Sequence, residues 1–179
     1  MRFYKATTWF AVSLLALGAC SGVRVLNTDR ADGFQIGQYK TYDFYTISAS
    51  GDTVSATYGR NIALLEAAIE KQMQIKGLKR TASNPDLLVN IGVMVEEKVQ
   101  TRTTNIQDAP RYIGQRNYSW KSEEVEVGRY KEGTATIHLV ERASNKMVWK
   151  GAVAGVVPNQ PEKTAGLIDE GMAALFAKL

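Results

Sequence analysis

The chain contains one cysteine and one histidine among its 179 residues. Because Cys20 is alone, the rest of the chain has neither a disulfide nor a second thiol to help bind a metal. His138 is the one imidazole that a Ser-His-Asp arrangement could use, and the sequence has no Gly-x-Ser-x-Gly elbow. It also has no P-loop and no dinucleotide-binding fingerprint. These absences predict a protein without a metal, a cofactor or catalytic residues, and they favour a structural role for His138.

The apolar run at residues 9–17 (WFAVSLLAL) is too short to cross a bilayer, which needs about 20 residues. Arg2 and Lys5 precede this run, and Leu17-Gly18-Ala19-Cys20 ends it with two small residues before the thiol. This is the layout of a secretory signal peptide. The cysteine makes it resemble a bacterial lipobox, in which the thiol is acylated and the chain is cut just before it. An ordinary secretory cleavage site is the alternative.

Lipidation of Cys20 predicts a membrane as one partner of this protein, because several acyl chains together give stable anchoring. Ser21 follows the cysteine, at the position where an aspartate would resemble a signal for retention in the inner membrane. By that analogy we expect an outer-membrane lipoprotein that faces the periplasm of a Gram-negative cell envelope.

Length and composition suit a single domain. Removal of residues 1–19 leaves about 160 residues, and the chain is 45% hydrophobic and 22% charged, which is typical of a globular protein. The formal net charge is +4, of which Arg2 and Lys5 supply two, so the balance is too weak to indicate a nucleic-acid partner. We predict a signal peptide at 1–19, a lipidated N-terminus and tether at 20–33, and one domain at 34–179.

Hydrophobic periodicity predicts both strands and helices. Alternating apolar residues indicate strands at 41–45, 87–99, 125–140 and 147–157, with residues 23–26 joining the same sheet. Apolar residues three and four apart indicate a helix at 57–76, which Gly77 ends as a left-handed cap, and a last helix near Pro161 with Asn159 as its cap. The fold class expected is α+β: a two-layer sandwich in which two helices pack on one face of an antiparallel β-sheet.

Residues 98–121 follow neither period and combine basic with aromatic side chains. A connection this long is uncommon in a compact domain and is usually functional or disordered. One interpretation is a contact surface for an anionic or apolar partner. The other is a solvated hairpin extension whose rings pack on the sheet and whose basic groups pair with the acids that follow. The candidate contact residues are Arg102, Arg111, Tyr112, Arg116, Tyr118 and Trp120.

Several segments, taken in order, resemble the Domain of Unknown Function 4136 family of bacterial lipoproteins. The segments that carry the resemblance are residues 39–44 (YKTYDF), Asn61, Gly77-Leu78, residues 84–89 (NPDLLV), Gly133 with Ile137 and Leu139, and residues 148–151 (VWKG). The resemblance covers roughly residues 22–178. It implies an α+β domain that resides in the cell envelope, and it implies no catalytic residues.

The leading hypothesis is therefore a membrane-anchored, non-enzymatic lipoprotein that binds another envelope component, whether protein, lipid or glycan. The second hypothesis is a structural subunit of an envelope assembly, which would add an edge strand or the 98–121 segment to a larger complex. The third is a hydrolase of cell wall or lipid, which would need a pair of carboxylates across a cleft.

Overall fold

The computed structural model describes residues 22–51, 57–105, 108 and 121–179. These residues form six strands, two α-helices and a short 3-10 helix, η1, at Ile36–Gln38. The helices are α1 (Thr57–Ile75) and α2 (Pro161–Phe176). The strands are β1 (Val23–Arg30), β2 (Thr41–Gly51), β3 (Lys79–Arg80), β4 (Leu87–Thr103), β5 (Glu124–Glu141) and β6 (Lys146–Val156).

The six strands form one sheet in the order β1-β6-β5-β4-β2-β3. The α+β class is confirmed, but the prediction of an antiparallel sheet is wrong on one side. Strand β2 pairs in parallel with both β3 and β4, whereas the pairs β1–β6, β6–β5 and β5–β4 are antiparallel. The reason is the connection through α1, because a chain that crosses over a sheet through a helix returns in the same direction.

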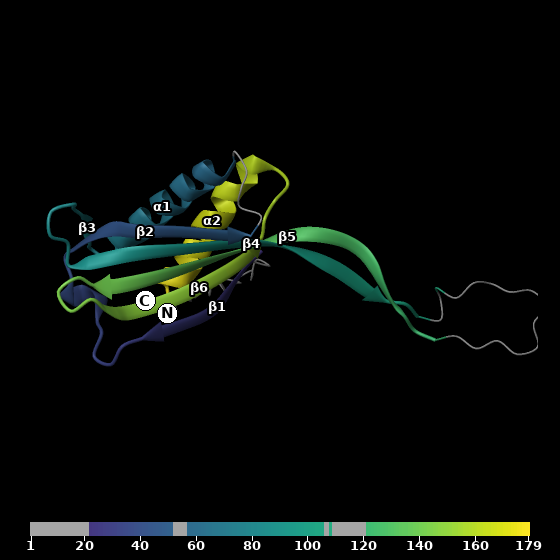
Figure 1. Ribbon diagram of the computed structural model, residues 1–179, viewed down its shortest axis with the longest axis horizontal. Helices are drawn as coiled ribbons and strands as arrows, with labels where there is room; N and C mark the ends of the chain where they lie inside the picture. The colour runs from purple at the N-terminus through teal and green to yellow at the C-terminus, as the bar shows by residue number, and fades with distance from the viewer. Residues whose placement is uncertain (1–21, 52–56, 106–107, 109–120) are drawn as a thin grey trace, which may run out of the picture.

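Both helices pack against the same face of the curled sheet (Figure 1). Helix α1 contributes Leu65, Ile69 and Met73 to the core, and helix α2 contributes Met172, Leu175 and Phe176. On the sheet, Leu87, Val89 and Ile91 of β4 are at most 1% exposed, which confirms the predicted core face of that strand. The alternation that predicted these strands therefore arises because one face of the sheet is covered by helices.

Helix α1 ends as the sequence predicts. Gly77 has a φ of 86°, and its N–H donates to the carbonyl of Gln74 at 2.9 Å. The N–H of Leu78 donates to the carbonyl of Met73 at 3.0 Å, and the Leu78 side chain is buried. These two bonds form a Schellman motif, which satisfies the last carbonyls of the helix and requires a left-handed residue where this chain has glycine.

Helix α2 begins at Pro161, as predicted, but its N-cap differs from the prediction. The N-cap residue is Gln160 rather than Asn159, and no side chain caps the first turn. Proline suits this first helical position because its φ is already helical and it has no N–H to satisfy.

The turn at residues 84–86 leads from β3 into β4 and also contacts the start of β2. The Asp86 carboxylate accepts hydrogen bonds from the backbone N–H groups of Lys40 at 2.8 Å and Thr41 at 2.9 Å. These bonds favour the charged carboxylate and lower the pKa of Asp86. Asn84 has a φ of 54°, in the left-handed region that asparagine tolerates. The carboxylate of this turn therefore holds the start of β2 in place.

Three segments differ in extent from the prediction. Strand β2 continues to Gly51, six residues beyond the predicted end at residue 45. The predicted tether at 20–33 contains β1, so the sheet begins three residues after Cys20. Residues 98–103, which follow no clear apolar period, are nevertheless strand, because their backbone groups pair with those of residues 124–130. Backbone pairing alone can extend a strand whose side chains are all exposed.

Candidate apolar binding site

On the face of the sheet that the helices cover, the side chains of β5 become progressively smaller toward one end. Along β5, the residues that face the helices are Leu139, Ile137, Ala135 and then Gly133. Leu139 and Ile137 are fully buried in the core, whereas Gly133 has no side chain to fill the space beneath the helices. The core therefore gives way to a hollow at the Gly133 end of the sheet.

Four neighbouring strands place small or medium residues in one row at that end. Val95 of β4 pairs with Gly133 of β5, Gly133 pairs with Gly155 of β6, and Gly155 pairs with Val23 of β1. Two adjacent glycines in the row remove the side chains that would otherwise meet the helices. This row forms the floor of a pocket between the sheet and both helices.

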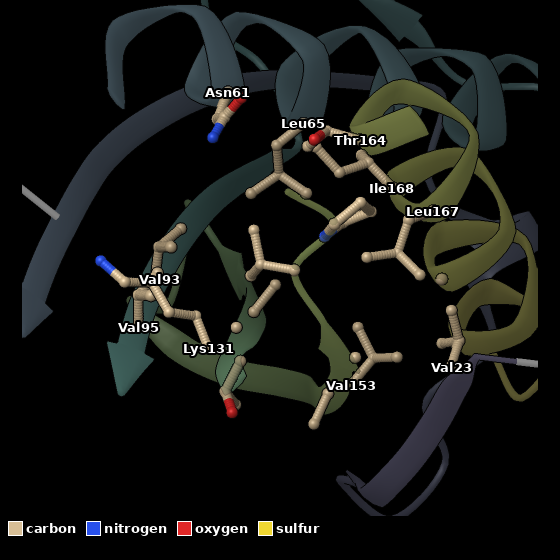
Figure 2. Close-up of a pocket in the computed structure, with 18 of the residues that line it drawn as sticks. Val23, Asn61, Leu65, Val93, Val95, Lys131, Val153, Thr164, Leu167 and Ile168 are labelled. Atoms are coloured by element: carbon tan, nitrogen blue, oxygen red, sulfur yellow. The ribbon is translucent and has the colours of Figure 1, made fainter. Parts of the chain in front are cut away.

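The pocket has a volume of about 320 Å³. Figure 2 shows Leu65 of α1, Leu167 of α2 and Val153 of β6 arranged around the same central space. The polar residues of the lining are Asn61, Lys131, Thr134, Asn159 and Thr164, and Thr164 is buried. The other lining residues are apolar or glycine. The described lining contains no aspartate, glutamate or histidine. A mainly apolar cavity with a few polar groups is typical of a site for an apolar small molecule.

Three parts of the chain meet at this pocket. Strand β1 starts there, since Val23 lines the pocket and the carbonyl oxygen of Gly22 would lie 3.3 Å from a Cβ on Gly155. The connection from β6 to α2 passes along it at Val157, Pro158 and Asn159. The extension of β4 and β5 also begins there, immediately after Val95.

We call that extension the arm: residues 97–103 of β4 paired with residues 124–131 of β5. Strand β2 pairs with β4 only as far as Val95, and β6 pairs with β5 only as far as Glu132, so no strand of the described residues lies on either side of the arm. Figure 1 shows it projecting well beyond the body of the domain. Eight residues of strand at about 3.3 Å each give a length of roughly 26 Å.

The arm combines exposed apolar side chains with ion pairs. Val99 and Val127 are each 50% exposed. Arg129 donates to the carboxylates of Glu126 at 2.7 Å and Glu97 at 3.2 Å. Surface ion pairs of this kind contribute little to stability. An isolated two-stranded ribbon is at best marginally stable, so exposed valines on it are typical of a contact surface.

Of the six candidate contact residues, the structure describes Arg102 alone. Its guanidinium donates to the Asp108 carboxylate at 2.8 Å, and this bond lowers the pKa of Asp108. Arg102 therefore forms an ion pair within its own segment. Arg111, Tyr112, Arg116, Tyr118 and Trp120 lie outside the described residues, as does the predicted lipidation site Cys20. The proposed roles of all these residues stay predictions.

His138 lies on the opposite face of the sheet from the pocket. It borders a shallow polar hollow of about 170 Å³ with Thr46, Ser48, Asn90 and Thr136. Burial, together with the nearby charge of Lys150, lowers the pKa of His138. Within the described residues, no group of three histidine, cysteine, aspartate or glutamate side chains is arranged to bind a metal.

The pocket is a feature that the sequence prediction missed. A signal was present, because the inward residues of β5 diminish to Gly133 and those of β6 end at Gly155. Gly151, two residues before Gly155 on β6, is instead a close-packing position, because Trp149 occupies the space of a side chain there. Recognising the hollow required the register that places Gly133 beside Gly155.

Neither helix in the described part of the chain is long and apolar enough to cross a membrane. No curated protein matches this sequence. Among solved structures, the chain is similar to a PDZ domain protein from Parabacteroides distasonis (14% identity, TM-score 0.49). That match covers 85% of this chain and 36% of the other protein, so the chain spans about a third of that relative.

Two further similarities cover most of both chains. The PelC dodecamer from Paraburkholderia phytofirmans is 10% identical, with a TM-score of 0.45 and coverage of 84% of this chain and 95% of the other. A minor lipoprotein from Acinetobacter baumannii is 11% identical, with a TM-score of 0.35 and coverage of 79% and 92%. The model of the family described as "Domain of unknown function (DUF4136)" matches residues 26–179. The chain therefore belongs to the DUF4136 family.

Proposed function

We propose that this protein is a non-enzymatic binding module of the bacterial cell envelope. In this proposal a lipid on Cys20 anchors it to the periplasmic face of the outer membrane, and the apolar pocket binds an acyl chain of an envelope lipid. The observation that carries the proposal is the pocket itself, about 320 Å³ between the sheet and both helices. This volume lies within the range of about 300–1,000 Å³ that small-molecule sites occupy.

The composition of the lining favours binding over hydrolysis. Hydrolysis of a lipid or a glycan needs a positioned nucleophile, acid or base, usually a carboxylate or an imidazole. No carboxylate or imidazole is among the described residues of the lining, and His138 lies across the sheet. In the two-layer sandwich that we propose for this fold, the helix layer closes the pocket from above and so shields a bound chain from water.

A bulky side chain introduced from α2 should block the pocket. A Cβ on Gly171 would lie 3.5 Å from Val23 Cγ1 and 3.7 Å from Val153 Cγ2, both pocket residues. We expect Gly171→Phe to weaken binding of the fluorescent fatty acid cis-parinaric acid at least about tenfold, a loss of about 1.4 kcal/mol. The measurement is a fluorescence titration of the mature chain from Ser21 onward, which contains every described strand and helix.

The matched control is Gly166→Phe on the same helix. No atom lies within 4 Å of a Cβ on Gly166, which is exposed, so this variant adds the same ring outside the pocket. It should bind the probe as the unaltered chain does, and circular dichroism should show both variants folded. Equal binding by the two variants, or no binding by the unaltered chain, would contradict an acyl-binding pocket.

The arm favours a second function, that of a structural subunit of an envelope assembly. Within the part of the chain that the structure describes, no further strand pairs with it, and Val99 and Val127 are half exposed. Burial of these valines against a partner would stabilise the complex by about 25 cal/mol per Å² of apolar surface removed from water.

Replacement of both arm valines tests this second function. We expect the double variant Val99→Thr/Val127→Thr to lose crosslinks to a protein partner in intact cells, while its free energy of unfolding changes by about 0.5 kcal/mol or less per site. Threonine keeps the β-branched shape and lowers the apolarity. The control is Val156→Thr, since Val156 is 49% exposed but lies on β6. Unchanged crosslinking in the double variant would count against an assembly through the arm.

A further inference from the structure

We infer that the occupant of the pocket is one of this protein's own acyl chains, attached at Cys20. The inference rests on the proposed function, because it requires lipidation of Cys20. It deepens that function by naming the ligand as a covalent part of the same molecule rather than a free lipid of the membrane. Its basis is the position at which the chain enters the sheet.

The start of β1 forms part of the pocket wall. Val23 lines the pocket, and Gly22 lies beside Leu167, with 3.7 Å between a Cβ on Gly22 and Leu167 Cδ1. A Cβ on Gly155 would also lie 3.5 Å from the same Leu167 atom. Gly22, Gly155 and Leu167 therefore meet at one edge of the cavity, so the segment leading to Cys20 begins at that edge.

The distance from this edge to Cys20 is short. Two residues span at most about 7 Å, even when the chain is fully extended. An acyl chain on the amine or the thiol of Cys20 therefore begins within reach of the pocket. Attachment through so short a linker gives the chain a high effective concentration at the site, and a free lipid must compete with it.

The chemistry of the lining suits a hydrocarbon chain. Leu65, Val153, Leu167, Ile168 and Met172 surround the space. An engineered cavity of about 150 Å³ with a similar aliphatic lining stays dry and binds benzene. A cavity of about twice that volume, open at one edge, accepts a longer apolar body. An occupied pocket would hold the start of β1, and with it the root of the arm, close to the membrane surface.

The test uses the full-length lipoprotein in living cells. Cells are fed a fatty acid that carries a photoactivatable diazirine, which enters both phospholipids and the acyl chains at Cys20. After illumination, the protein is purified, digested and examined by mass spectrometry. A chain that belongs to Cys20 joins the N-terminal peptide to a pocket peptide, whereas a free phospholipid adds its own mass to the pocket peptide.

We expect the joined pair of peptides to form, with the second partner containing Val153, Leu167 or Met172. Gly171→Phe should lower its yield about tenfold or more, because the ring occupies the space of the chain, and Gly166→Phe should leave the yield unchanged. The Gly166→Phe control and the unaltered protein keep the result interpretable if Gly171→Phe proves unstable.

Three other outcomes overturn the inference, and they differ in what they say about the proposed function. A pocket peptide that carries phospholipid mass leaves the proposed function standing. An acylated N-terminal peptide with no crosslink to the pocket leaves the anchor standing but removes the pocket ligand, which the parinaric acid titration then checks independently. An N-terminal peptide without any acyl mass would contradict the lipid anchor at Cys20 as well as the pocket ligand.

Discussion

Replacement of Trp149 by alanine lowers the free energy of unfolding by roughly 3–5 kcal/mol, the usual range for a large buried aromatic. Trp149 is 1% exposed and lies in the centre of the core, with its ring centroid 5.8 Å from that of Phe176 on α2. Its side chain packs between β6 and the C-terminal helix, and its ring also covers Gly151. Since domains are stable by about 5–15 kcal/mol in total, the variant should be close to unfolding at room temperature.

Urea denaturation followed by far-UV circular dichroism measures this loss. The control is Met147→Ala, two residues earlier on the same strand, where the side chain is 44% exposed. We expect that control to change stability by about 0.5 kcal/mol or less, as is usual for exposed positions. A loss below about 1 kcal/mol in Trp149→Ala would mean that the indole does not fill the core as the structure places it.

Gly151→Ala should also destabilise the protein, although it adds only one methyl group. A Cβ on Gly151 would lie 2.6 Å from Trp149 Cη2 and 2.7 Å from Leu175 Cδ1. Both of these side chains are at most 1% exposed, so they are packed within the core. Overpacking of this kind typically costs about 1–3 kcal/mol. The measurement is again the free energy of unfolding in urea.

Two comparisons separate overpacking from a general effect of alanine. Gly92→Ala, in the neighbouring part of the sheet, brings its Cβ no closer than 3.8 Å to any atom and should be neutral or slightly stabilising. In a Trp149→Ala background, Gly151→Ala should lose the part of its cost that comes from the indole ring, while the contact with Leu175 Cδ1 remains. Additive losses in the double variant would contradict direct contact between the two positions.

Helix α1 illustrates what local sequence patterns predict well. Its apolar residues recur at Leu65, Ile69 and Met73, and Gly77 ends it with the left-handed geometry expected. Both signals depend on neighbours within about four residues, the span of a helical hydrogen bond. Strand β4 behaves similarly, because its alternation reflects a single covered face.

Strand β2 illustrates what local patterns leave open. Its alternating residues Tyr42 and Phe44 indicate a strand with one covered face, but they do not specify the direction of its neighbour. The parallel pairing with β4 follows from the path of α1 across the sheet. The arm is a related case, because residues 98–103 pair through backbone groups that every residue possesses.

The sequence by itself determined the α+β class, the two helices and most of the strands, because these depend on short-range periodicity and on turn residues, and the order of its segments carried the resemblance to the family. Only the tertiary structure decided that the sheet is mixed, that an arm projects from it, and that a pocket lies at the root of the arm. The pocket depends on a register that aligns Val95, Gly133, Gly155 and Val23 across four strands. These residues are up to 132 positions apart in the chain, so no local pattern could bring them together.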